Sequence, residues 1–178
     1  EIVTIPLTGA LEHQDSMGNK EVLHAGEVQA MSAGTGVFHS EYNAKSDEAC
    51  TLLQIWLFPE ERNVTPQYGQ RYYDSDAVKR EWHAVVNPMG KGDGLGIHQQ
   101  AWFNLTRISA GTRRDYACKR AENGVYFFVI EGAISVDSQA LGTRDAAGVW
   151  GQESYAVTAT EDAYVLAIDL PLQLPRMG

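Results

Sequence analysis

A histidine and a glutamate two positions apart, His39 and Glu41, are the pair in this sequence best suited to chemistry. On a β-strand, residues i and i+2 point to the same face, so the imidazole and the carboxylate would lie side by side. An imidazole nitrogen and a carboxylate oxygen can together bind a divalent transition metal, and such a set with open positions suits non-haem iron. The pair therefore predicts a metal site on a strand.

The pair also has a plainer interpretation, because a histidine and a glutamate on a solvated strand face would have the same spacing. Most charged side chains are exposed, so the spacing alone favours that plainer interpretation. The preceding loop, residues 32–36, reads SAGTG, and its glycines let the backbone turn sharply into the strand. This frame around the pair favours the metal site.

The stretch from Gly26 to Glu41 reads GEVQAMSAGTGVFHSE and resembles the second metal motif of cupin proteins in its pirin form. That form has a glycine, an acidic residue, a glutamine, a methionine and a serine or threonine, followed by A-G-x-G, two residues and H-x-E. Asn43 matches the asparagine that often ends the cupin motif. The resemblance to the pirin family implies that His39 and Glu41 are metal ligands.

The resemblance continues to the first residue. In the pirin family an H-x-H-x3-E motif supplies two more histidine ligands, and its glutamate is followed by a strand, a glycine and another strand. Residues 1–11, EIVTIPLTGAL, resemble the end of that motif, with Glu1 as the closing glutamate. We therefore expect two further histidine ligands upstream of Glu1 and an incomplete metal site within the sequence shown.

The activity that the resemblance implies is an iron-dependent dioxygenase similar to quercetin 2,3-dioxygenase, which opens a flavonol ring with O2. Iron is the expected cofactor, and another divalent transition metal is the alternative. The metal would hold substrate and oxygen side by side and polarise the substrate enolate. Glu41 would be both a ligand and a catalytic general base. The expected substrate is a small aromatic molecule such as a flavonol.

Two other functions stay open. Pirin-like proteins also act as metal-dependent regulatory partners of transcription factors or metabolic enzymes. The oxidation state of iron would then change a protein-binding surface, and an acidic face could dock a basic partner. The remaining alternative is a degenerate barrel without metal.

Four further side chains are candidates for the core and the substrate pocket. Met31 and Phe38 flank the H-x-E pair, and Gln54 and Trp56 share one face of their strand. We expect them mainly in the barrel core, and some of them in a pocket beside the metal, because ligands bind in the mouths of barrels.

The remaining histidines and the cysteines give weaker signals. His13 and His24 are alternative ligands or plain turn and surface residues, whereas His83 and His98 have no partner at ligand spacing. The triplet YAC at residues 116–118 stands where the second half would carry an H-x-H. No resolving thiol or activating base is near Cys118, so a redox site is disfavoured.

Short apolar runs separated by turn residues dominate the chain, and helical periodicity is almost absent apart from residues 76–80. We predict an all-β protein with two tandem cupin-type barrels, each a double-stranded β-helix or jelly-roll. A weak internal similarity around Gly9 and Gly132 also indicates two copies. The predicted domains are an N-terminal barrel with the metal motif, a bridge, and a C-terminal barrel without a metal motif, at residues 1–60, 61–93 and 94–178.

Composition limits the partners. The chain is 44% hydrophobic and 21% charged, which is typical of a folded protein. The formal net charge of −9 repels phosphate backbones, so direct nucleic-acid binding is disfavoured. No apolar run is long enough to cross a bilayer. Two cysteines far apart, Cys50 and Cys118, are typical of reduced thiols, so we expect a cytoplasmic protein with no membrane partner.

Overall fold

The computed structural model describes residues 1–173, which form two compact units. Among the described residues, unit 1 comprises 1–73 and 88–99, and unit 2 comprises 74–87 and 100–173. The described residues are almost all strand, loop and turn, with α1 as their one α-helix. The predicted all-β class is therefore confirmed.

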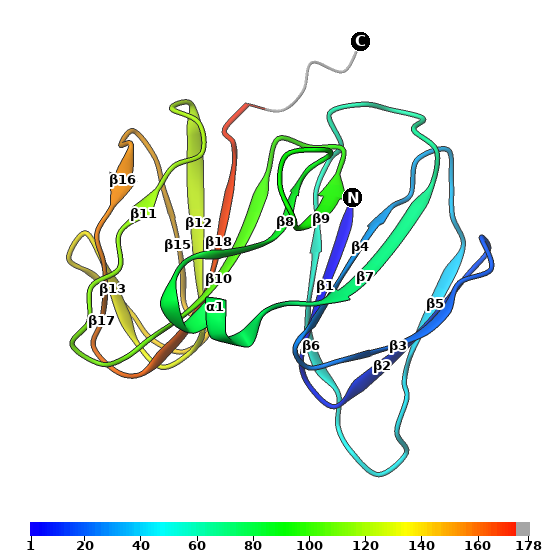
Figure 1. Ribbon diagram of the computed structural model, residues 1–178, viewed down its shortest axis with the longest axis horizontal. Coiled ribbons are helices and arrows are strands. Elements are labelled where there is room, and N and C mark those ends of the chain that lie inside the picture. Colours follow the sequence, from blue (N-terminus) through cyan, green and yellow to red (C-terminus); the bar gives the residue numbers. More distant parts are fainter. Residues whose placement is uncertain (174–178) are drawn as a thin grey trace. The chain divides into compact units, whose positions relative to one another are not determined.

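Unit 1 consists of two antiparallel sheets that form opposite walls (Figure 1). The larger sheet has the order β6–β1–β4–β7, and the smaller has the order β3–β2–β5. Side chains of the smaller sheet contact those of the larger one, so a jelly-roll interior lies between them. The strands of these two sheets are β1 Ile2–Thr8, β2 Ala10–Asp15, β3 Lys20–His24, β4 Glu27–Ser32, β5 His39–Asn43, β6 Thr51–Trp56 and β7 Gln67–Tyr72. The short strand β9 Leu95–Ile97 belongs to unit 1 but to neither of these sheets.

The interior of unit 1 is partly polar. Gln29 on β4, Thr4 on β1 and Gln54 on β6 are direct cross-strand partners and therefore point to the same face of the larger sheet. Gln29 reaches His13 on the opposite sheet, so this face lines the interior. Thr4 and Gln29 are buried, which is unusual for polar side chains and indicates a site rather than a plain core.

Unit 2 repeats this construction with a more apolar interior. One wall has the order β15–β12–β18–β10–β8, and the other consists of the sheets β14–β13–β17 and β11–β16 (Figure 1). Aromatic rings fill the space between the walls, with Tyr116 edge-on to both Trp82 and Phe127. The elements are α1 Ser75–Arg80, β8 His83–Pro88, β10 Trp102–Ile108, β11 Tyr116–Ala117, β12 Asn123–Glu131, β13 Ile134–Val136, β14 Gln139–Leu141, β15 Ala146–Val149, β16 Ser154–Tyr155, β17 Val157–Ala159 and β18 Ala163–Pro171.

The predicted duplication is visible in the strand order. β1 lies between β6 and β4 in unit 1, and β12 lies between β18 and β15 in unit 2. Gly9 links β1 to β2 and Gly132 links β12 to β13, with φ angles of 73° and 77°. At both corners a Cβ would collide with backbone of a neighbouring segment, so glycine is required twice at the same topological place.

The segment predicted as a bridge is part of both units. Residues 61–93 include β7, which pairs with β4 along its length, as well as α1 and β8. The two units therefore meet after residues 73, 87 and 99, and not at the predicted boundaries at residues 60 and 94. Proline and glycine interrupt the apolar pattern of this segment, and β7 is a half-exposed edge strand with a weak sequence signal. The short helix predicted at residues 76–80 is confirmed as α1, capped by the Asp74 carboxylate.

Among residues 1–173, no helix is both long and apolar enough to cross a membrane.

Substitution of Gly34 by alanine tests the loop that leads into β5. Gly34 has a φ of 52°, and a Cβ at this position would collide with the carbonyl oxygen of Val64. We expect Gly34→Ala to lower the free energy of unfolding by about 2 to 4 kcal/mol, measured by urea denaturation. Gly148→Ala is the control, because a Cβ there meets open space. Equal stability of the two variants would contradict this role of Gly34.

Candidate functional site

The predicted pair lies at the start of β5, where a glycine loop delivers it. Gly34 and Gly36 have φ angles of 52° and 130°, which non-glycine residues rarely adopt, and the backbone N–H of Gly36 donates to Ala33. β5 then pairs with β2 so that Asp15 is opposite His39 and His13 is opposite Glu41. The strand and the shared face predicted for the pair are thus present, with two further polar residues beside it.

His13 is fully buried and is the centre of the cluster. Its Nε2 lies 3.2 Å from Asp15 Oδ2, so Nε2 carries the proton that this carboxylate accepts. The Gln29 amide nitrogen lies 3.2 Å from Nδ1 on the other side of the ring. The imidazole also stacks on Tyr68 at 4.8 Å and on His39 at 5.8 Å between ring centroids. His13 is therefore neither a surface residue nor a turn residue.

Asp15 anchors His13 to the following turn. Its carboxylate accepts hydrogen bonds from the backbone of Met17 and Asn19 and from the Asn19 amide, in addition to His13. Burial would raise the pKa of Asp15, but the hydrogen bonds from Asn19, His13 and Met17 outweigh it and hold the pKa below its ordinary value. The carboxylate is thus ionised and keeps the His13 ring in one orientation.

Glu41 lies between His13 and Gln54, with a side chain that is 19% exposed. Its Oε1 is 3.9 Å from His13 Nδ1, and its Oε2 accepts a hydrogen bond of 2.7 Å from the Gln54 amide. Gln54 in turn accepts a 3.3 Å hydrogen bond from the Trp56 indole N–H. A chain of polar contacts therefore runs from the buried Asp15 to the exposed Trp56.

The electrostatic field around this cluster is negative. Burial and then the carboxylates of Glu21, Asp15, Glu27 and Glu41 raise the pKa of Tyr68, which keeps its hydroxyl protonated. That hydroxyl donates to Gln70 Oε1 at 2.8 Å. Carboxylates on several strands of unit 1 thus act on the same phenol.

The donor chemistry around β5 fits a transition metal, but the described ligand set is partial. His39 is exposed and Glu41 half-buried, so an imidazole nitrogen and a carboxylate oxygen are available side by side. Thr4 Oγ1 and Gln29 Oε1 are buried without a hydrogen-bond partner in the described part of the chain, which indicates a polar ligand in this interior. No group of three or more His, Cys, Asp or Glu within residues 1–173 could hold a metal ion. The expectation of two further histidines upstream of Glu1 stays a prediction.

The candidate pocket residues separate into core and surface. Met31 is 1% exposed and shares the interior face with Trp56 through their common partner Ile2. Phe38 and Trp56 are 88% and 70% exposed, and Gln54 is exposed as well, so the assignment of these three side chains to the barrel core is wrong. Phe38 lies in the loop before β5, and Trp56 ends a strand at the edge of its sheet. Their place in a substrate pocket stays a prediction.

The other histidines stand on elements other than β5. His24 is exposed on β3, and its backbone N–H donates to Glu27. His83 and His98 are half-buried, on β8 and after β9. Glu1 is buried and accepts a 2.7 Å hydrogen bond from Ser32.

Unit 2 has a polar network where a metal motif was not expected. The Tyr116 hydroxyl accepts from the Asn104 amide and donates to Asp169, which also accepts from Asn123. Burial, then the Asp169 charge, raises the pKa of Tyr116, so the phenol stays neutral. Burial and Asp169 likewise raise the pKa of Cys118, which argues against a reactive thiolate there.

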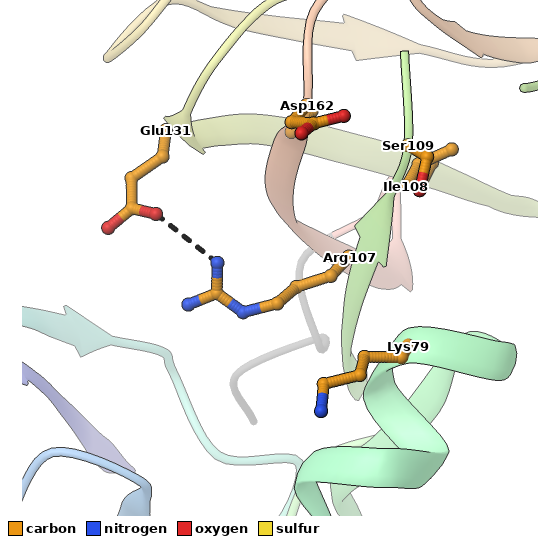
Figure 2. A pocket seen from close by; sticks show the side chains of 7 residues that line it. Lys79, Arg107, Ile108, Ser109, Glu131 and Asp162 are labelled. Atoms are coloured by element: carbon orange, nitrogen blue, oxygen red, sulfur yellow. Dashed lines mark hydrogen bonds and ion pairs between the residues drawn. The ribbon is translucent and has the colours of Figure 1, made fainter. Parts of the chain in front are cut away.

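A pocket of about 370 Å³ in unit 2 contains none of the predicted residues (Figure 2). Its charged side chains largely pair with neighbours: Arg107 with Glu131 at 3.2 Å, and Lys79 with Asp76 at 3.1 Å. Asp162 accepts the backbone N–H of Ala110. We therefore place the candidate site in unit 1.

Sequence reasoning gave His13 only a weak signal, as an alternative ligand or a turn residue, and it missed Asp15 and Gln29 as members of the site. The alternation in ALEHQD could have indicated that His13 and Asp15 share the inward face with Leu11. Gln29 was part of the motif, but only the pairing of β4 with β1 shows that its side chain enters the interior. Register between strands is the information that the sequence did not provide.

Comparison with known proteins gives consistent matches. Residues 1–57 match a family model described as Pirin, and residues 84–170 match one described as Quercetinase C-terminal cupin domain. A quercetin 2,3-dioxygenase of Escherichia coli (strain K12) is 39% identical over 171 residues, covering 96% of this chain and 72% of that protein. A pirin-like protein of Caulobacter vibrioides is 32% identical, covering 95% of this chain and 72% of that protein. The crystal structure of the bacterial pirin YhhW from Escherichia coli in complex with nickel(II) has a TM-score of 0.88 and 37% identity, covering 96% of this chain and 72% of that one.

Asp15→Asn tests the anchor of His13. The pKa of Asp15 is lower in the folded chain than its ordinary value of 3.8, so folding favours the charged form. Its stabilisation is fully present above that value and is lost as the pH falls through the lower folded pKa. We expect the variant to be less stable than the parent at pH 7, and this difference to shrink below pH 3.8. Urea midpoints at both pH values measure it, and a difference independent of pH would contradict the assignment.

Proposed function

The chain belongs to the pirin family of cupin proteins, and on this premise we propose that it is a metal-dependent dioxygenase acting on a small aromatic substrate such as the flavonol quercetin. The observation that carries the proposal is the pairing of β5 with β2. It puts the pair His39 and Glu41 against Asp15 and the buried His13, so that the two candidate ligands lie beside a buried polar cluster. The name of the Escherichia coli relative supports the reaction class.

The proposed metal is iron, with another divalent transition metal as the alternative. A relative's structure was solved in complex with nickel(II), which supports a divalent ion as the bound metal. We assign His39 and Glu41 as ligands. When bound, such a metal acts as a Lewis acid that polarises the substrate oxygen and brings the reactants together.

The remaining residues act on the substrate and on the proton. Glu41 has one carboxylate oxygen held by Gln54 and the other beside His13, so it is oriented for accepting a proton from a flavonol hydroxyl. Trp56 and Phe38 offer exposed aromatic faces on which a flat ring can stack. Met31 is buried on the same face of the larger sheet as Trp56.

A second candidate function is metal-dependent binding of a protein partner. Exposed aromatic side chains favour it, because solvent-facing aromatics are enriched at interfaces; Phe38, Tyr42 and Phe58 are 88%, 65% and 61% exposed. A pull-down with and without metal tests this function, and partners that do not change with metal would contradict it.

We propose a cytoplasmic location. Cys50 and Cys118 are both free, which supports a reducing compartment.

Ligand substitutions test the proposed function. We expect His39→Ala and Glu41→Ala each to lower metal affinity by about 100-fold or more, since even outer-shell changes cost 10- to 100-fold. Both variants should lose quercetin-dependent O2 consumption, followed with an oxygen electrode and by bleaching of the flavonol absorbance. His24→Ala is the matched control, since this histidine is exposed on another strand.

Two results would contradict the proposed function or the proposed ligands. Iron-loaded parent protein that neither consumes O2 nor bleaches quercetin would leave a metal-binding protein without this activity. Ligand variants that retain parent metal affinity would show instead that the site is not on β5.

A further inference from the structure

We propose that Gln54 is a positioning residue, which fixes the Glu41 carboxylate and links its orientation to the Trp56 indole. This inference rests on the proposed function for its catalytic meaning. It goes further by assigning one side chain the task of connecting the aromatic surface at the edge of β6 with the carboxylate on β5.

The geometry of β6 produces the link. Gln54 and Trp56 are two residues apart and therefore point to the same face of the strand. The Gln54 amide nitrogen donates to Glu41 Oε2 at 2.7 Å, and its amide oxygen accepts from Trp56 Nε1 at 3.3 Å. Both polar atoms of one amide are thus used, one toward the carboxylate and one toward the indole.

Only an amide of this length can make both contacts. A carboxylate at position 54 would accept from the indole but could not donate to Glu41, and it would add a like charge beside it. An aliphatic side chain would do neither. The indole N–H is a donor only, so the Gln54 amide oxygen must face Trp56 and the amide nitrogen must face Glu41.

The link contributes little to the stability of the fold. Gln54 and Trp56 are exposed, and hydrogen bonds between exposed groups add little to stability. Losing them should leave the barrel folded. Their consequence lies in the site, where Glu41 has His13 on one oxygen and Gln54 on the other.

Stacking of an aromatic substrate on Trp56 therefore acts on Glu41 through Gln54. A ring that tilts the indole changes the hydrogen bond to the Gln54 oxygen and, through the rigid amide, the one to Glu41 Oε2. The substrate class that this arrangement favours is a flat aromatic molecule with an ionisable hydroxyl, since one end needs a stacking face and the other a proton acceptor.

The first test measures nickel(II) affinity by calorimetry, together with kcat and KM for quercetin. We expect Gln54→Met to lower metal affinity about 10-fold and Trp56→Phe about 3-fold, with the double variant no worse than Gln54→Met alone. Trp56→Phe keeps an aromatic face, so it should lower kcat more than it raises KM. Gln152→Met is the matched control, since it removes an exposed hydrogen bond from a glutamine side-chain amide to the Asp137 carboxylate in unit 2. Melting temperatures within about 2 °C of the parent show that all variants are folded.

The second test needs no metal. The indole N–H signal of Trp56 is followed by NMR, in the parent and in Glu41→Ala. We expect the signal to shift when Glu41 is removed and to stay in place when the same change is made in the Gln54→Met background. That pattern can arise only if Gln54 transmits the change.

The outcomes separate the inference from the proposed function. Parent protein that binds no nickel and does not act on quercetin would contradict the proposed function, and the NMR shift alone would then decide the inference. Any of three results would overturn the role of Gln54. These are a Gln54→Met variant with the nickel(II) affinity of the parent, fully additive losses of affinity in the double variant, and a Trp56 indole signal that does not shift when Glu41 is removed.

Discussion

The pairing of β2 with β5 is the interaction on which the site in unit 1 depends. Its register puts Asp15 opposite His39 and His13 opposite Glu41, so a shift of β5 by one residue would turn His39 and Glu41 away from the two β2 side chains. Asp15 fixes the register from one end, because its carboxylate also closes the following turn. The glycine loop before β5 fixes it from the other end.

The buried imidazole between these strands also ties the two sheets together. His13 contacts Asp15 on its own sheet and Gln29 and Tyr68 on the other, so the polar interior is held by hydrogen bonds and ring stacking rather than by aliphatic packing. A polar interior is costly unless its groups are paired. Thr4 and Gln29 each retain an unpaired oxygen in the described part of the chain, and this residual polarity is what suits the space to a polar ligand.

The sequence was sufficient for the fold class, for the duplication and for the pair on β5, because each of these has a local pattern. Alternation predicts strands, Gly9 and Gly132 mark the repeated corner, and the glycines at positions 34 and 36 mark the turn that leads into the strand of His39 and Glu41. The environment of the pair was not predictable in the same way. His13 looked like a turn residue because its partners Gln29 and Tyr68 are 16 and 55 positions away, and Trp56 looked like core because local hydrophobicity does not reveal that a strand lies at the edge of its sheet.

The two units complete their polar interiors in different ways. In unit 2, the buried Asp169 carboxylate accepts hydrogen bonds from residues of the same unit: the Tyr116 hydroxyl, the Asn123 amide and the backbone N–H of Lys119. If the proposed function is right, unit 1 instead needs a bound metal ion to satisfy the polar groups of its interior. A ligand that binds only the folded state stabilises it by mass action, so metal scarcity would weaken unit 1, where the site lies. The supply of metal in the cell would thereby set the lifetime of the protein as well as its activity, with proteolysis beginning in unit 1.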